Sequence, residues 1–138
     1  MSRRDMLDVV VIGAGVVGAS AALALAQQGL RVAIVEAHEP TAWSPASPDL
    51  RVYAFAPDSQ ALMQSLGVWP AIAGARVHPY RHMCVWDAAG GGDLHFDADT
   101  IGRSELGHIV EHGLLVDRLW SAVLADTRIA RYCPDKIR

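Results

Sequence analysis

Apolar runs and a run of small residues alternate at the start of the chain. Residues 9–12 are four β-branched residues in succession, which favours a strand buried in a parallel sheet. Residues 19–26 are rich in alanine and leucine, which are strong helix formers. A second apolar run follows at 32–35. This order of strand, helix and strand predicts an α/β unit.

The pattern then predicts shorter elements. Three prolines make residues 37–50 a loop, and Pro57 opens a helix that extends to about Leu66. Gly67 is expected to cap this helix, on which Leu62 and Leu66 share one face ready to pack. The remaining elements predicted on either side are an extended segment at 51–55 and a short helix that ends at Ala73.

Polar and apolar residues alternate further along the chain. Residues 82–87 predict a strand, the glycine-rich residues 88–92 a turn, and residues 93–96 a half-buried return strand. This β-hairpin differs in character from the α/β unit, so we interpret it as an insertion. Three further elements are predicted: a strand at 108–111, an amphipathic helix at 113–125 with Leu115, Leu119, Ala122 and Leu124 apolar, and a strand at 128–133 that Pro134 ends.

Composition narrows the function classes. The 138 residues are 51% hydrophobic and carry a net charge of −3, which implies no general affinity for nucleic acid or anionic membranes. Cys84 and Cys133 match no metal or redox spacing, so we expect both to be free, reduced and partly buried, as in a cytoplasmic protein. The six histidines form no metal-site pattern, and no metal is expected.

Two features bear on where this chain belongs. Residues 9–26 contain no charge, as in a membrane span or signal peptide, but three spaced glycines and the adjacent Asp8 argue against both.

A dinucleotide-binding sheet usually has about five or six strands. Because only three candidates for it are found here, we expect an N-terminal fragment of a longer enzyme.

The turn after the first strand carries the candidate chemistry. Gly13 permits a tight turn out of the strand, Gly15 lets backbone approach a diphosphate, and Gly18 lets the helix lie close to the strand. The helix N-terminus favours a phosphate. Glu36, 18 residues past Gly18, stands where an acid accepts hydrogen bonds from a ribose. The alternative is an ordinary glycine turn with Glu36 as a solvated strand end.

Several segments together resemble the ubiquinone-pathway aromatic hydroxylases, which are single-component FAD monooxygenases of the 4-hydroxybenzoate hydroxylase type. The glycine motif alone occurs in many flavoproteins, whereas the combination is much more specific. The segments are residues 8–18, Val35-Glu36-Ala37, Asp49-Leu50-Arg51-Val52-Tyr53-Ala54, Leu66-Gly67-Val68-Trp69 and residues 105–112.

The resemblance implies a Rossmann-like FAD-binding domain of the glutathione-reductase type, incomplete here and interrupted by a hairpin of the substrate domain. The expected boundaries are 1–74 for the first part of the FAD-binding domain, 75–110 for the insertion and 111–138 for the return. The resemblance also implies FAD as cofactor, NAD(P)H as co-substrate, and O2 with a phenol or quinol as substrates. Such a lipophilic substrate implies that a cytoplasmic parent enzyme visits the membrane as a peripheral protein.

The resemblance also implies roles for single residues. Arg51 matches the family arginine that contacts the cofactor, although a surface salt bridge with Asp49 is an alternative. His112 departs from the Asn or Arg of related enzymes. The Asp-Gly and Gly-Asp-x-x-His segments of the family are missing here, and the catalytic residues stay unknown. An FAD-dependent oxidase or dehydrogenase, or an inactive dinucleotide-binding fragment, remains an alternative function.

Overall fold

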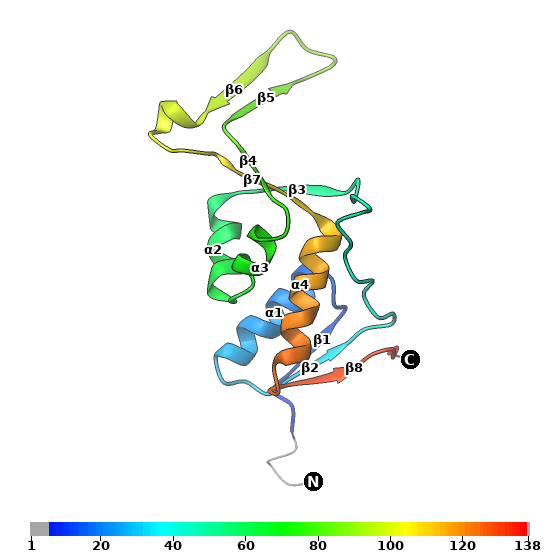
Figure 1. The fold of residues 1–138 in the computed structure, drawn as a ribbon. Coiled ribbons are helices and arrows are strands. Elements are labelled where there is room, and N and C mark those ends of the chain that lie inside the picture. Colours follow the sequence, from blue (N-terminus) through cyan, green and yellow to red (C-terminus); the bar gives the residue numbers. More distant parts are fainter. Residues whose placement is uncertain (1–5, 138) are drawn as a thin grey trace.

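A computed structural model of the chain describes residues 6–137. Its lower half is a three-stranded parallel sheet in the order β1-β2-β8, with two helices packed against one face (Figure 1). The prediction of a strand-helix-strand unit is confirmed, as is the predicted strand near residue 130. The elements are β1 (Val9–Ile12), α1 (Val16–Gln27), β2 (Val32–Val35), α4 (His112–Ala125) and β8 (Ile129–Tyr132).

The central strand β2 is the buried strand of this sheet. Val32 and Ile34 are completely buried beneath the helices, as expected for a parallel strand. The expectation of burial was wrong for β1, on which Val10 and Ile12 are 50% and 71% exposed. β1 is an edge strand, and within residues 6–137 only β2 pairs with it. Val11 packs toward the helices, whereas Val10 and Ile12 point to the opposite face of the sheet, which no described helix covers.

The core lies where α1 and α4 cross above the sheet. α1 contributes small residues, with Ala19, Ala22 and Ala26 fully buried, so α4 approaches closely. The predicted amphipathic face of α4 is confirmed by Leu115 and Leu119, both fully buried. Leu124 is 46% exposed instead, because it follows the buried Val123 and turns about 100° away from it.

A second, antiparallel sheet lies beyond the helices in the order β3-β7-β4. Beside it, the helix α2 ends at Ser65, with Leu66 as its C-cap and Gly67 following at a φ of +76°. The expected packing is correct for Leu66, but Leu62 is 45% exposed and Met63 packs into the core in its place. The bounds here are β3 (Val52–Phe55), α2 (Pro57–Ser65), α3 (Trp69–Ala73), β4 (His78–Tyr80) and β7 (Gly107–Glu111).

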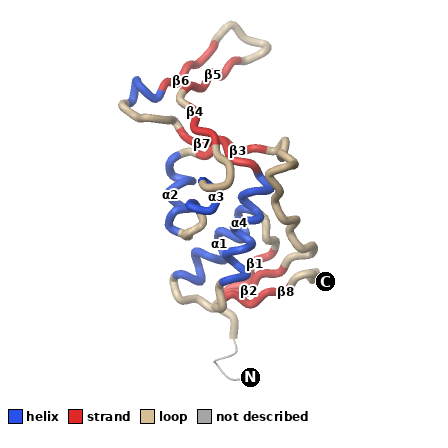
Figure 2. Tube along the Cα trace, viewed as in Figure 1, coloured by secondary structure: helices blue, strands red, loops and turns tan. Residues whose placement is uncertain are grey.

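The predicted hairpin is confirmed as β5 (His82–Trp86) and β6 (Asp93–Asp97), which lead into the short 3-10 helix η2 (Ala98–Ile101). It projects away from the helices and both other sheets (Figures 1 and 2). The expectation that its return strand is half-buried was wrong, since Leu94 and Phe96 are 62% and 49% exposed. No other described element covers either face of these two strands.

The uncharged segment 9–26 folds as β1, a turn and α1, in agreement with the argument against a membrane span or a signal peptide. In residues 6–137, every helix is too short or too polar to cross a bilayer.

Candidate functional site

The turn between β1 and α1 has the shape that its glycines predict. Gly13 adopts a φ of +93°, which side-chain-bearing residues rarely adopt, and its N–H donates to the carbonyl of Val35 at 2.8 Å. A Cβ on Gly18 would lie 1.9 Å from the carbonyl oxygen of Gly13. The expected tight turn and the close approach of α1 to the end of β1 are therefore confirmed.

Gly15 and the first turn of α1 form an open surface. Within residues 6–137, no heavy atom lies within 4 Å of where a Cβ on Gly15 would stand. Gly15 is the N-cap of α1, no side chain caps the helix, and its first turn contains no acidic residue. Among the described residues, the first N–H groups of this twelve-residue helix are therefore not capped by a side chain, and such groups favour a negatively charged ligand.

Glu36 lies at the end of β2 and reaches this turn. Its Oε2 accepts the Ala14 N–H at 2.6 Å, and its Oε1 accepts the His38 N–H at 3.0 Å. These two backbone donors hold the pKa of Glu36 below its ordinary value. The structure therefore brings the predicted glycines and the predicted acid together, and the acid is ionised at neutral pH.

A shallow cavity of about 560 Å³ adjoins Glu36, lined by Ala37, His38 and residues 134–137. The N–H of Asp135 donates to the carbonyl of Glu36 at 2.9 Å, which ties the segment after β8 to the end of β2. Cys133 stands at this junction, free and partly buried as expected, and burial raises the pKa of its thiol. The other free cysteine, Cys84, is exposed, contrary to expectation.

Arg51 lies immediately before β3 and contacts the start of α4. Its Nη1 is 3.0 Å from Nε2 of His112, whose Nδ1 is 3.0 Å from the Tyr53 hydroxyl. The alternative of an ion pair with Asp49 is not what forms in the described residues. Asp49 instead accepts the backbone N–H groups of Arg51 and Gly113, both at 2.9 Å, which lower its pKa.

Topology places the Arg51 cluster at the same end of the molecule as the glycine turn. α1 follows β1 after three residues, and α4 leads into the parallel strand β8 after three. Both helices therefore run opposite to the strands, and their N-termini lie at the carboxyl ends of the sheet (Figure 1). That edge is where open α/β sheets bind ligands.

Sequence reasoning missed a buried acid beside this edge. Glu111 is 7% exposed, and its Oε2 accepts the Trp43 indole N–H and the Asp49 N–H, both at 3.0 Å. Its Oε1 accepts from Arg76 at 2.8 Å. Burial raises the pKa of Glu111, but these three donors outweigh burial and lower it below its ordinary value. The available signal was a charge at the end of an apolar strand.

The Glu111 network fastens the proline-rich loop to α4. The Arg76 guanidinium lies 5.3 Å from the ring centre of Trp43, and that of Arg118 lies 5.7 Å from it. Trp43 thus packs against these two guanidinium groups. The Asp49 N–H donates to Glu111, and the Asp49 carboxylate accepts the Gly113 N–H. These hydrogen bonds hold the loop against the start of α4, where Arg51 contacts His112.

Comparison with known proteins agrees with this geometry. A family model described as "FAD dependent oxidoreductase" matches residues 8–118. The chain belongs to this family. Over 131 residues it is 34% identical to the 3-demethoxyubiquinol 3-hydroxylase of Escherichia coli, covering 94% of this chain and 33% of that protein. Over 118 residues it is 35% identical to the mitochondrial ubiquinone biosynthesis monooxygenase COQ6 of Xenopus tropicalis, covering 81% and 25%.

Solved structures share the fold. A mutant of PqsL from P. aeruginosa matches with a TM-score of 0.69 at 17% identity, covering 91% of this chain and 32% of that one. The flavin-dependent monooxygenase PieE, solved with FAD and substrate, matches with a TM-score of 0.65 at 22% identity, covering 93% and 24%. The chain spans about a third or less of the length of these relatives.

Proposed function

We propose that the chain supplies the FAD-binding portion of a monooxygenase that hydroxylates a phenol or quinol ring in ubiquinone biosynthesis, using NAD(P)H and O2. The contact between Glu36 and the glycine turn carries this proposal, because it joins a carboxylate to an open helix N-terminus. The family match and the names of the relatives support the reaction class.

Three glycines and one acid would hold the ADP half of FAD. The diphosphate would lie against Gly15, where no neighbouring atom obstructs it, with Gly13 and Gly18 fixing the turn. The ionised carboxylate of Glu36 would exchange its backbone donors for the ribose hydroxyls. The adjoining cavity at Ala37 and residues 134–137 would take the adenosine end.

Arg51 would provide positive charge at the same edge of the sheet. Its guanidinium is held by His112 and not neutralised by a carboxylate of the described chain, which leaves it available to a negatively charged part of the cofactor. His112 keeps a hydrogen-bonding side chain where the resemblance implies Asn or Arg. When bound, FAD would carry reducing equivalents from NAD(P)H to O2, while these residues orient it.

The proposed division of the chain follows the expected boundaries. Residues 1–74 and 111–138 would belong to the FAD-binding domain, and residues 75–110 to the substrate domain, from which β5 and β6 project. A quinol substrate would bring the parent enzyme, a cytoplasmic protein, to the membrane surface as a peripheral protein.

Flavin binding tests the proposed site. Gly15→Val places a branched side chain where the diphosphate approaches, so we expect FAD affinity, measured by flavin fluorescence, to fall sharply. Gly91→Val is the matched control, because Gly91 also has no neighbour within 4 Å but lies in the hairpin turn. Equal FAD binding by both variants would contradict the assignment.

Oxygen incorporation tests the proposed reaction. A protein that contains this chain within the longer length of its relatives should insert labelled oxygen from O2 into the quinol ring when NAD(P)H is consumed. Reduction of O2 without labelled product would instead support the oxidase or dehydrogenase alternative, and would leave the FAD site itself intact.

A further inference from the structure

The projecting hairpin has one polar and one apolar face. Successive side chains of a strand point to opposite faces, and the register pairs His82 with Asp97, Cys84 with His95 and Trp86 with Asp93. These six residues therefore share one face. The other face carries Met83, Val85, Leu94 and Phe96. Every side chain on the hairpin strands that commonly binds a metal thus lies on the polar face.

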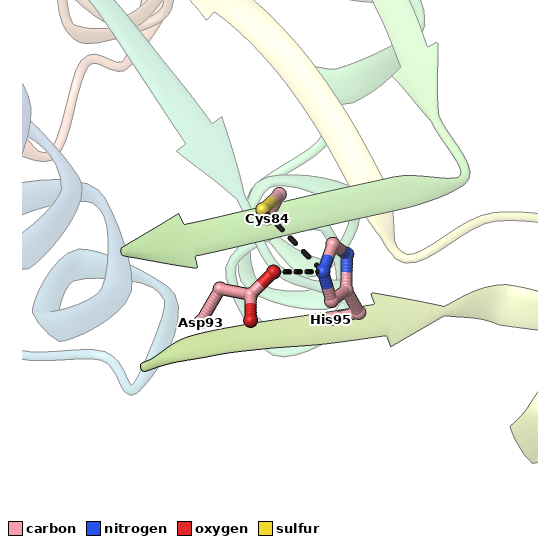
Figure 3. A group of neighbouring side chains, drawn as sticks. All are labelled: Cys84, Asp93 and His95. Atoms are coloured by element: carbon pink, nitrogen blue, oxygen red, sulfur yellow. Dashed lines mark hydrogen bonds and ion pairs between the residues drawn. The ribbon is translucent and has the colours of Figure 1, made fainter. Parts of the chain in front are cut away.

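Three of these side chains converge on one point. The Sγ of Cys84 lies 3.9 Å from Nε2 of His95, and that same nitrogen lies 2.5 Å from Oδ2 of Asp93 (Figure 3). The three potential ligand atoms all lie within 4.8 Å of one another. Cys84 comes from β5, whereas Asp93 and His95 come from β6, so the cluster bridges the two strands.

We propose that Cys84, Asp93 and His95 form a Zn²⁺ site on the polar face of the hairpin. Sulfur, imidazole and carboxylate are the ligands that Zn²⁺ takes, and three protein ligands leave its fourth position to water. Tetrahedral bonds of about 2.0–2.3 Å place ligand atoms about 3.3–3.8 Å apart. The Cys84–His95 separation of 3.9 Å is already close to this range. The His95–Asp93 separation of 2.5 Å must widen by about 1 Å, which rotation of the exposed Asp93 carboxylate allows.

The architecture of the hairpin gives such a site a physical role. A two-stranded ribbon is marginally stable in water when nothing covers it. An ion bound to one side chain of β5 and two of β6 would fasten the strands in their register, since binding energy at a site formed by folding is also folding energy. Sequence spacing gave no sign of this site, because Cys84 and His95 become neighbours only through strand pairing.

The exposure of the cluster favours a metal over a nucleophile. A Cys-His-Asp series also occurs in cysteine hydrolases, but there the thiol attacks its substrate in a water-excluding pocket with donors for the developing charge. Here the side chains of His95 and Asp93 are 68% and 61% exposed. A bound ion with one open position tolerates this exposure to water.

Cobalt titration of the chain tests the site directly, because Co²⁺ replaces Zn²⁺ and reports its ligands by absorption. We expect one Co²⁺ per chain, with a thiolate-to-cobalt charge-transfer band that added Zn²⁺ removes. Cys84→Ser and His95→Gln should each lose the band. Cys133→Ser removes the other cysteine, and His82→Gln removes a histidine of the same face outside the cluster, so both should keep it.

Two outcomes would overturn the proposal: absence of the band from the unaltered chain, or its persistence in Cys84→Ser. FAD binding serves as the check that each variant is folded, since none of these residues belongs to the proposed cofactor site. Amide hydrogen exchange gives a second readout. Zn²⁺ should slow exchange in β5 and β6 of the unaltered chain but not of His95→Gln, and equal rates with and without Zn²⁺ would contradict the fastening role.

Discussion

The parallel sheet and the projecting hairpin are built from similar short strands but are stabilised differently. In the parallel sheet, Val32 and Ile34 are completely buried under α1 and α4. In the hairpin, Val85 and Leu94 are 47% and 62% exposed, and of the described strands only the partner strand pairs with theirs. The first region is held by burial of apolar area, whereas the second depends on pairing between its own strands.

Carboxylates show the same contrast. Glu36 and Glu111 accept backbone or buried donors, and hydrogen bonds lower the pKa of both. In the hairpin, Asp93 contacts an exposed histidine, as does Asp97, which lies 3.4 Å from His82. Glu36 and Glu111 are therefore held by the fold, while Asp93 is accessible to an external ligand. Asp97 is intermediate, because its Oδ1 also accepts the Asp99 N–H at 2.9 Å.

Gly18→Ala should have the largest effect, and it should destabilise the parallel sheet and the helices that pack on it. The new Cβ would lie 1.9 Å from the Gly13 carbonyl oxygen, so α1 must move away from β1. We expect the free energy of unfolding to fall by about 3 kcal/mol, despite the better helix propensity of alanine. Gly15→Ala, which meets no neighbour, should change stability by less than about 0.5 kcal/mol in the same denaturant titration. Equal losses would contradict the close-approach argument.

Glu111→Ala should loosen the loop that carries Arg51. It removes the acceptor for Trp43, Asp49 and Arg76, of which Arg76 regains water because its side chain is 39% exposed. Chemical denaturation should show a loss of about 2–4 kcal/mol. Glu105→Ala is the control, because among the described residues the Glu105 carboxylate accepts only from the adjacent Ser104 hydroxyl. An equal loss of unfolding free energy for Glu105→Ala would show that removal of a negative charge causes the loss, and not the hydrogen bonds of Glu111.

Glu36→Ala should weaken FAD binding more than it affects the fold. Loss of a charge-assisted hydrogen bond to the ribose should lower the binding free energy by about 1–3 kcal/mol in a fluorescence titration. Glu39→Ala removes an equal charge from a neighbouring exposed position and should bind FAD as the unaltered chain does. Unchanged affinity for Glu36→Ala would remove the ribose contact from the proposal.

Lowering the pH should reduce the free energy of unfolding in part through protonation of Glu111. Its folded pKa lies below its unfolded pKa of about 4.3, so its contribution is complete above the unfolded value and is lost as pH falls through the folded value. The difference in unfolding free energy between the unaltered chain and Glu111→Gln should therefore shrink on going from about pH 6 to pH 3. A difference independent of pH would contradict the lowered pKa.

Leu94→Thr, on the hairpin, should change the free energy of unfolding least. Leu94 is 62% exposed on the hairpin, and threonine suits a strand equally well. The free energy of unfolding should change by less than about 0.5 kcal/mol. A loss of about 2 kcal/mol or more would show that the apolar face of the hairpin is covered in solution, and a sedimentation measurement would detect a second copy of the chain as the cover.

Local signals sufficed for most elements and for the glycine turn, but the short strand β4 and the 3-10 helix η2 were not predicted. A β-branched run, a run of small helix formers and three spaced glycines constrain backbone angles directly, which is why residues 8–36 were predicted well. Faces were predicted less well, since Leu62 and Leu124 are apolar yet exposed. Which apolar side chain is buried depends on where the neighbouring element lies, and periodicity alone does not contain that information.

By itself, the sequence determined an α/β unit with a glycine turn and an acid at the end of its second strand, because these features act over a few residues. Only the tertiary structure decided that Arg51 meets His112, that Glu111 binds Trp43 and Asp49, and that Cys84 faces His95 across two strands. These partners are 11 to 68 positions apart in the chain. Contacts over such separations follow from strand register and helix packing, which the whole fold sets.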